Sequence, residues 1–99
     1  MSDTATVEQE DIKISKPKRY KVILLNDDYT TFEFVIAVLT QIFNHSYSSA
    51  VDLATRIHHA GSGVAGVYIY EIAEQKKTDV MTIAQQNGYP LQAKLEEDE

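Results

Sequence analysis

Three adjacent polar residues, Asn26, Asp27 and Asp28, place one amide and two carboxylates directly after the apolar run at 22–25. Hydrogen-bond acceptors of this kind, set beside aliphatic residues at a strand-to-helix turn, suit a small and partly buried pocket that holds a cation. The plainer interpretation is that Asn and Asp favour turns and helix N-termini, because their side chains bond to nearby backbone N–H groups. The triplet is therefore a candidate site whose meaning depends on the elements that position it.

The segments on either side of the triplet have the patterns of a strand and a helix. Residues 20–25 are mostly apolar, which is typical of a strand buried on both faces. The run at 30–33 has the form of a capping box, in which Thr30 accepts from a backbone N–H and Glu33 reaches back. A helix is then indicated by apolar residues at helical spacing: Phe34, Val35, Val38, Leu39, Ile42 and Phe43.

The middle of the chain predicts a second helix and a strand. Ser48 and Ser49 are expected to cap the helix, and the glycines of the run at 61–63 are expected to end it. Residues 64–72 are rich in β-branched and aromatic side chains, so they predict the longest strand, with Glu71 at its far end. The apolar face of the second helix carries Ala50, Leu53, Ala54 and Ile57.

A third helix and a last strand complete the expected fold. The helix is predicted over about 74–86, with Val80, Ile83 and Ala84 inward. Residues 91–96 alternate apolar and polar, the period of a half-buried strand. The order is βααβαβ, an α+β fold in which helices cover one face of a three-stranded sheet. These patterns leave the sheet antiparallel or mixed.

Length and composition limit the chain to one small domain. Its 99 residues hold a single core, and a domain of this size favours binding over multistep catalysis. Residues 1–17 lack periodicity and end at Pro17, so we expect a flexible N-terminal extension followed by a core domain at 18–99. The absence of cysteine excludes a disulfide framework and a cysteine nucleophile.

The charge of the chain and the lack of targeting segments limit the classes of partner and the cellular location that we expect. The net charge of −6 and the lack of a basic stripe argue against nucleic acid as a partner. No run is long enough to span a membrane, and no signal peptide is visible, so we expect a cytoplasmic protein and no membrane association. A monomer is the default expectation.

His58 is the main candidate to join Asn26 and Asp28, because it lies at the C-terminal end of the second helix, just before glycines. The pair His58 and His59 invites a metal interpretation. Adjacent helix positions, however, point about 100° apart and do not readily chelate one ion. We therefore expect no metal site and no cofactor.

Several motifs match one family in type and spacing. They are the run YKVILLNDDYT at 20–30, EFVI at 33–36, IH at 57–58, GV at 66–67, EIAE at 71–74 and PL at 90–91. Together they resemble the ClpS family of bacterial N-end-rule adaptors, and the likeness covers residues 20–96. The resemblance implies three antiparallel strands against three helices. It also implies a non-enzymatic adaptor that grips substrates (N-degrons) beginning with Leu, Phe, Tyr or Trp and delivers them to a Clp-family AAA+ unfoldase for degradation.

The resemblance assigns roles to individual residues. Asn26, Asp28 and His58 correspond to the ligands of the substrate α-amino group, and Asp27 adds negative charge beside them. The side-chain pocket is expected to be lined by Leu24, Leu25, Thr30, Phe32, Val35, Ala54, Ile57 and Leu91.

The partner surface is assigned in the same way. The family's contact with the N-terminal domain of a ClpA-like or ClpC-like unfoldase matches Glu71 and Lys76, for which an exposed ion pair is the plainer interpretation. The segment before Pro17 resembles the family's mobile extension, which engages the unfoldase during delivery.

Three positions depart from the family pattern. Phe32 stands where a gatekeeping Met is usual, Thr31 replaces the preceding Pro, and Ala54 replaces another Met. Phe is bulkier and stiffer than Met, whereas Ala frees volume on the opposite helix, so the pocket is expected to be reshaped. Val and Ile are expected to bind poorly as first residues, while the ranking among Leu, Phe, Tyr and Trp stays open.

Two other functions are compatible with the residues. One is a small hydrolase that uses Asp27, Asp28 and His58 as acid, base or metal ligands. The other is an interaction domain with no pocket. An adaptor binds peptides with a free aromatic or Leu N-terminus without cleaving them, a hydrolase consumes its substrate, and a pocketless domain does not respond to a Phe-initiated peptide.

Overall fold

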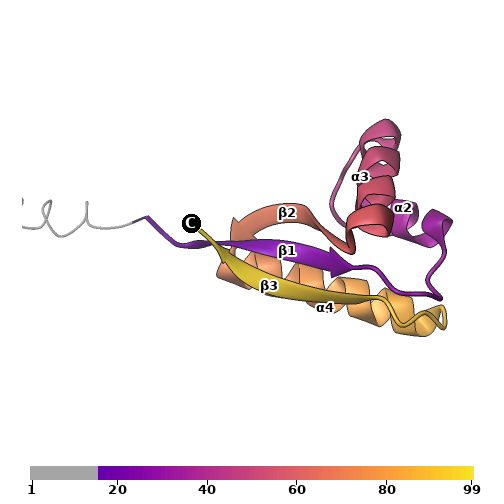
Figure 1. Ribbon diagram of the computed structural model, residues 1–99. Helices are drawn as coiled ribbons and strands as arrows, with labels where there is room; N and C mark the ends of the chain where they lie inside the picture. Colours follow the sequence, from indigo (N-terminus) through magenta and orange to yellow (C-terminus); the bar gives the residue numbers. More distant parts are fainter. Residues whose placement is uncertain (1–15) are drawn as a thin grey trace, which may run out of the picture.

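A three-stranded antiparallel sheet and three helices make up the structure (Figure 1), a computed structural model that describes residues 16–99. The sheet order is β2-β1-β3. This confirms the predicted α+β class, the order βααβαβ and the antiparallel sheet. The elements are β1 (Arg19–Leu25), α2 (Phe32–Gln41), α3 (Tyr47–Ala60), β2 (Ser62–Ile69), α4 (Tyr70–Gln86) and β3 (Gln92–Asp98).

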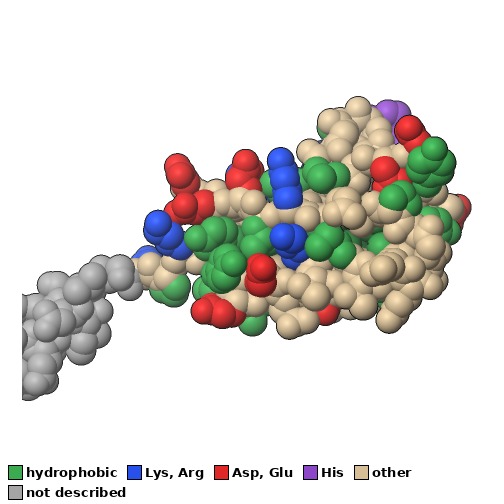
Figure 2. Space-filling view, turned by 90° about the horizontal axis from the view of Figure 1, so that it is seen from below, with side chains coloured by type: hydrophobic (Ala, Val, Ile, Leu, Met, Phe, Trp, Pro, Cys, Tyr) green, Lys and Arg blue, Asp and Glu red, His purple; other side chains and the backbone are tan. Residues whose placement is uncertain are grey.

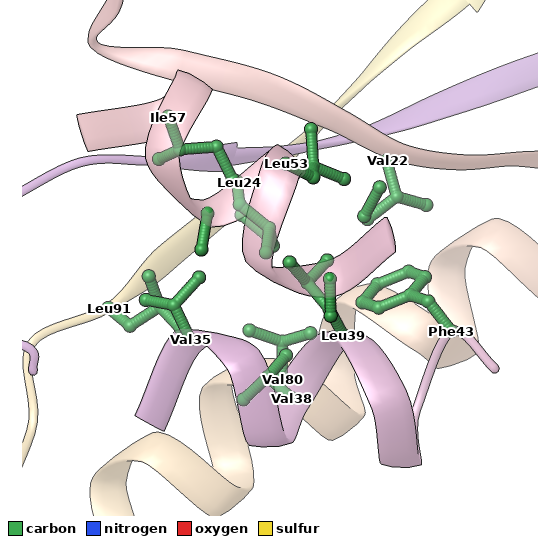
Figure 3. Close-up of a cluster of buried hydrophobic side chains, with 14 of the residues drawn as sticks. Val22, Leu24, Val35, Val38, Leu39, Phe43, Leu53, Ile57, Val80 and Leu91 are labelled. Atoms are coloured by element: carbon green, nitrogen blue, oxygen red, sulfur yellow. The ribbon is translucent and has the colours of Figure 1, made fainter. Parts of the chain in front are cut away.

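The central strand β1 contributes side chains to the hydrophobic core. Val22 and Leu24 are fully buried on the face that packs against the helices, as Figure 3 shows, and Ile23 is buried on the opposite face. Figure 1 shows α4 running along β1 and β3, with α2 and α3 gathered at the end where β1 stops. The loops that follow β1 and α3 therefore meet at that end of the molecule.

Two helices are capped by other residues than predicted: the cap of α2 lies one residue later in the chain, and the cap of α3 lies two residues earlier. α2 is capped by Thr31, whose hydroxyl accepts from the backbone N–H of Phe34 at 3.1 Å, and not by Thr30. α3 is capped by Ser46, which accepts from the N–H of Ser49 at 3.2 Å, two residues before the predicted Ser48. Clusters of Ser and Thr offer several possible caps, and tertiary contacts decide among them.

The boundary between β2 and α4 also differs from the prediction. The strand ends at Ile69, so Tyr70, Glu71 and Ile72 belong to the first turn of the helix. At its other end β2 already begins at Ser62, since that residue pairs with Leu25 of β1. Strand propensity reflects the packing of a side chain on a pleated surface, and Tyr70 and Ile72 lie exposed on a helix instead.

Two further expectations concern the N-terminal extension and membrane association. The predicted extension at 1–17 lies almost wholly outside residues 16–99. Within the part of the chain that the structure describes, no helix is long and apolar enough to cross a bilayer.

Candidate functional site

The turn after β1 is organised by the carboxylate of Asp27. Its Oδ1 accepts from the backbone N–H groups of Tyr29 at 2.8 Å and Thr30 at 2.7 Å, and its Oδ2 accepts from the Thr30 hydroxyl at 2.7 Å. An Asp side chain that bonds to the backbone two and three residues ahead fixes a tight turn before a helix. The triplet is thus partly a turn device, as the plainer interpretation proposed, and Thr30 serves this turn instead of capping α2.

The same contacts set the charge of Asp27. Partial burial raises the pKa of its carboxyl, but the hydrogen bonds from the Thr30 N–H, the Thr30 hydroxyl and the Tyr29 N–H favour the charged form. Together these bonds outweigh burial and hold the pKa of Asp27 below its ordinary value. Asp27 therefore contributes a fixed negative charge beside its neighbours, while both of its oxygens are engaged by the turn.

A backbone hydrogen bond brings the end of α3 to this turn. The N–H of Asn26 donates to the carbonyl of Gly61 at 2.9 Å, and the N–H of Gly61 donates to the carbonyl of Ile57 at 2.9 Å. Gly61 has φ of 95°, a left-handed conformation that ends a helix and that glycine adopts without strain. His58 consequently lies in the last turn of α3, next to the residues that follow β1.

One pocket of about 420 Å³ lies between these segments. At the same end of the molecule, on the right in Figure 2, a histidine, acidic side chains and hydrophobic side chains lie close together. The lining combines the exposed Asn26, Asp28 and His58 with the buried Val35, Ala54 and Ile57. The complete lining is Asn26, Asp27, Asp28, Thr30, Phe32, Val35, Ala54, Ile57 and His58.

Three of the residues predicted to line the pocket lie elsewhere. Leu24 and Leu91 belong to the buried core, and Figure 3 shows Leu91 beside Val35. Leu25 is half-buried at the end of β1 and does not border the cavity. Alternation along a strand separates its two faces but does not separate a core from a cavity within that core, so sequence alone does not decide which of these residues border the cavity.

Sequence reasoning missed one backbone contribution to the pocket wall. A Cβ added to Gly63 would lie 2.8 Å from Cγ1 of Ile57 and 3.1 Å from Cδ1 of Leu53. The first strand residues after α3 thus press directly against the side chain that forms the pocket wall. A glycine within a strand pattern often marks such a close approach of backbone, which is the signal that was available.

The two residues predicted to contact an unfoldase have different environments. Glu71 is exposed in the first turn of α4. Lys76 is half-buried, and its Nζ donates to the carbonyl of Ile42 at 2.6 Å and lies 5.5 Å from the ring centre of Tyr68. The ammonium therefore holds the C-terminal end of α2 against α4, and among residues 16–99 no ion pair joins Lys76 to Glu71.

The polar residues of the site do not form a metal-ligand cluster. In the described part of the chain, no group of three or more His, Asp or Glu side chains has a geometry that could hold an ion. His58 and His59 have ring centres 5.3 Å apart in an edge-to-face arrangement. The acceptors of the pocket mouth suit an organic cation with N–H donors.

Comparison with known families places the chain in one of them. Residues 15–94 match the family model described as ATP-dependent Clp protease adaptor protein ClpS. The chain belongs to the ClpS family. ClpS proteins are adaptors and not enzymes, so the family assignment does not support the hydrolase alternative.

Individual ClpS relatives match over nearly the whole chain. The ClpS adapter protein of Campylobacter jejuni is 50% identical over 98 residues, covering 99% of this chain and all of the relative. That of Wolinella succinogenes is 46% identical over 96 residues, with 97% and 94% of the two chains covered. The structure of Agrobacterium tumefaciens ClpS2 bound to L-phenylalaninamide matches with a TM-score of 0.81 and 38% identity, covering 84% of this chain and 100% of that one.

Proposed function

We propose that this ClpS protein binds the N-terminus of substrates that begin with Leu, Phe, Tyr or Trp and delivers them to a Clp-family AAA+ unfoldase. The observation that carries the proposal is one pocket in which Asn26, Asp28 and His58 lie with the apolar wall formed by Ala54 and Ile57. The Agrobacterium relative bound to L-phenylalaninamide supports it, because that ligand combines a free α-amino group with an aromatic side chain.

The polar residues of the pocket match the chemistry of a free N-terminus. An α-amino group has a pKa of about 8, so it is mainly cationic at neutral pH and offers three N–H donors. Asn26 supplies an amide oxygen, Asp28 a carboxylate and His58 an imidazole nitrogen, while Asp27 adds charge nearby. Acetylation removes the positive charge and two donors, which leaves acceptors unpaired at a cost of about 1 to 3 kcal/mol each.

The apolar part of the pocket matches a large first side chain. Val35, Ala54 and Ile57 are buried residues that line a volume of about 420 Å³. Burial of one large apolar side chain contributes about 2 to 3 kcal/mol, and each charge-assisted hydrogen bond contributes about 1.5 to 3 kcal/mol. With three such bonds the favourable contributions total roughly 6.5 to 12 kcal/mol before the cost of association, a range that includes the value of about 8 kcal/mol for micromolar binding.

Two residues determine which large hydrophobic first residues the pocket selects. Phe32, at 41% exposure, borders the pocket from the start of α2, and the buried Ala54 faces it from α3. An aromatic ring at the rim has few rotamers and resists branching at the first β-carbon of a ligand, while a methyl group on α3 leaves depth. We expect Val and Ile to bind poorly and the deep pocket to accept aromatic rings.

A peptide series tests the pocket, the gate and the amine together. Fluorescence anisotropy is measured with peptides that differ only at the first residue: Leu, Phe, Tyr, Trp, Ile, Met and acetyl-Phe. The Leu and aromatic peptides are expected to bind in the micromolar range or tighter, and the Ile and acetyl-Phe peptides at least about tenfold more weakly. If the Ile peptide binds as tightly as the Leu peptide, Phe32 does not exclude β-branched first residues. If acetyl-Phe binds as tightly as Phe, the polar residues do not recognise a free amine.

Delivery requires a second surface for the unfoldase. We assign it to the start of α4, where the exposed Glu71 lies between the exposed apolar side chains of Tyr70 and Ile72. This surface is offered to the N-terminal domain of a ClpA-like or ClpC-like unfoldase by a monomeric adaptor. Glu71→Lys should weaken unfoldase association while leaving the melting temperature and peptide binding unchanged, and loss of folding would refute this separation.

A further inference from the structure

His45 uses both of its ring nitrogens to connect two elements of the fold. It lies in the link between α2 and α3, where its backbone N–H donates to the carbonyl of Leu39 at 3.0 Å. Its Nε2 lies 2.8 Å from the carbonyl oxygen of Ala65, and its Nδ1 lies 3.0 Å from Oγ of Ser49. Because a carbonyl oxygen only accepts, Nε2 carries a hydrogen and donates to Ala65, while Nδ1 is paired with the Ser49 hydroxyl.

The carbonyl that His45 binds belongs to a β-bulge. Val22 of β1 pairs with Gly66 and Ile23 pairs with Val64, so Ala65 is the extra residue of β2 and has no partner in the register. A bulge leaves one residue outside the ladder and bends its strand. The hydrogen bond from His45 therefore holds β2 at the point where its path is set least by β1.

α3 is consequently held to the sheet at both ends. Its C-terminal end is fixed by the hydrogen bond between Gly61 and Asn26, and its first turn is fixed through Ser49 and His45. Between these two points, Ile57 of α3 presses against the backbone of Gly63 at the start of β2. The helix that carries the pocket wall thus has one anchor beside the pocket, at Gly61, and a second about three turns before it, at Ser49.

We propose that His45 is a positioning residue for the substrate pocket, because it fixes the distance of α3 from β2 and so the depth of the pocket at Ala54 and Ile57. This proposal rests on the function assigned to the pocket. His45 is not among the residues that line the pocket. Its effect passes through the two hydrogen bonds to Ser49 and Ala65 and the rigid helix that follows.

The test compares His45→Ala with His45→Gln, which keeps an N–H donor at the reach of Nε2. Thr55→Ala is the matched control, because the Thr55 hydroxyl donates to the carbonyl of Val51 at 2.8 Å within α3 and links no two elements. Affinities for Phe-, Trp- and Leu-initiated peptides are measured well below the melting temperature of each variant. His45→Ala is expected to change the Trp-to-Leu affinity ratio by about threefold to tenfold, and His45→Gln and Thr55→Ala by less than about twofold.

A second readout does not depend on ligand binding. The methyl resonances of Ala54 and Ile57 in the free protein should shift in His45→Ala and return toward the wild-type positions in His45→Gln. A lower melting temperature with unchanged affinity ratios and unchanged methyl resonances would overturn the proposal and leave His45 with a merely structural role. If His45→Ala does not fold, Ser49→Ala, which removes one of the two bonds, must show the same shifts in smaller size, and their absence would overturn the proposal. Failure of the wild-type protein to bind any peptide would contradict the assigned function, whereas the methyl shifts would still decide the role of His45.

Discussion

The backbone N–H of Asn26 donates a hydrogen bond to the carbonyl oxygen of Gly61 over 2.9 Å. This bond joins the residue after β1 to the residue that ends α3, and it places two predicted ligands of the substrate amine at one pocket mouth. The relationship depends on backbone atoms, so it persists when side chains of the site change.

Gly61→Ala should weaken substrate binding through the backbone. Gly61 has φ of 95°, and nothing lies within 4 Å of a Cβ at this position, so the substitution causes backbone strain without a steric clash. We expect a loss of about 1 to 2 kcal/mol in the free energy of unfolding. Gly88→Ala is a matched control, because Gly88 has φ of 78° and equally open surroundings. Urea unfolding should show similar losses for both, while anisotropy should show weaker peptide binding for Gly61→Ala alone.

Gly63→Ala should move the pocket wall. The added methyl would lie 2.8 Å from Cγ1 of Ile57, which must shift, and overpacking of this kind costs about 1 to 3 kcal/mol. We expect reduced stability in urea and a larger loss of affinity for Trp-initiated than for Leu-initiated peptides. Because Ile57→Ala removes this Cγ1, the losses in the double variant Gly63→Ala/Ile57→Ala should be smaller than the sum of the two single losses, and additive losses would refute the contact.

Ala54→Met should fill the pocket from α3. Ala54 is buried at 2% exposure and borders the cavity, so a longer side chain takes volume that a ligand would use. We expect affinity for Trp- and Phe-initiated peptides to fall about tenfold or more, with a smaller loss for Leu. An equal loss for all first residues would show that Ala54 does not set the depth of the pocket.

Asp27→Ala should remove a contribution to stability that depends on pH. The pKa of Asp27 is depressed in the folded protein, so its contribution is fully present above the unfolded pKa of about 4 and is lost as the pH falls through the folded pKa. We expect the variant to lose about 1 kcal/mol at neutral pH, as for a lost cap. The difference in unfolding free energy from the wild type should shrink below about pH 4, and a difference independent of pH would contradict the assignment.

Lys76→Met should destabilise the fold, unlike Glu71→Lys. The Lys76 ammonium donates to the carbonyl of Ile42 at 2.6 Å, and Met keeps the apolar stem but not the donor. We expect a loss of about 1 to 2 kcal/mol in thermal or urea unfolding, because a charged donor to a partly buried carbonyl is removed. If Lys76→Met melts like the wild type, its bond to α2 contributes little, and weaker unfoldase association could then be assigned to a lost contact.

Local patterns along the chain determined much of the fold. The apolar run before Asn26 and the helical spacing after Phe32 predicted β1 and α2, and the alternation around Ala93 predicted β3. These elements are readable because a strand and a helix sort side chains by fixed periods of two and 3.6 residues. The NDD triplet and His58 are likewise indicated as candidate site residues by their type and by their place at the ends of elements.

The tertiary structure alone decided how those residues are used. It committed both oxygens of Asp27 to a turn, placed Leu24 and Leu91 in the core, and directed Lys76 to a helix end. It also set Gly63 against Ile57. Each outcome is a competition between several nearby partners for one hydrogen bond or one volume. Such a competition is settled by contacts between elements far apart in sequence, which no local period records.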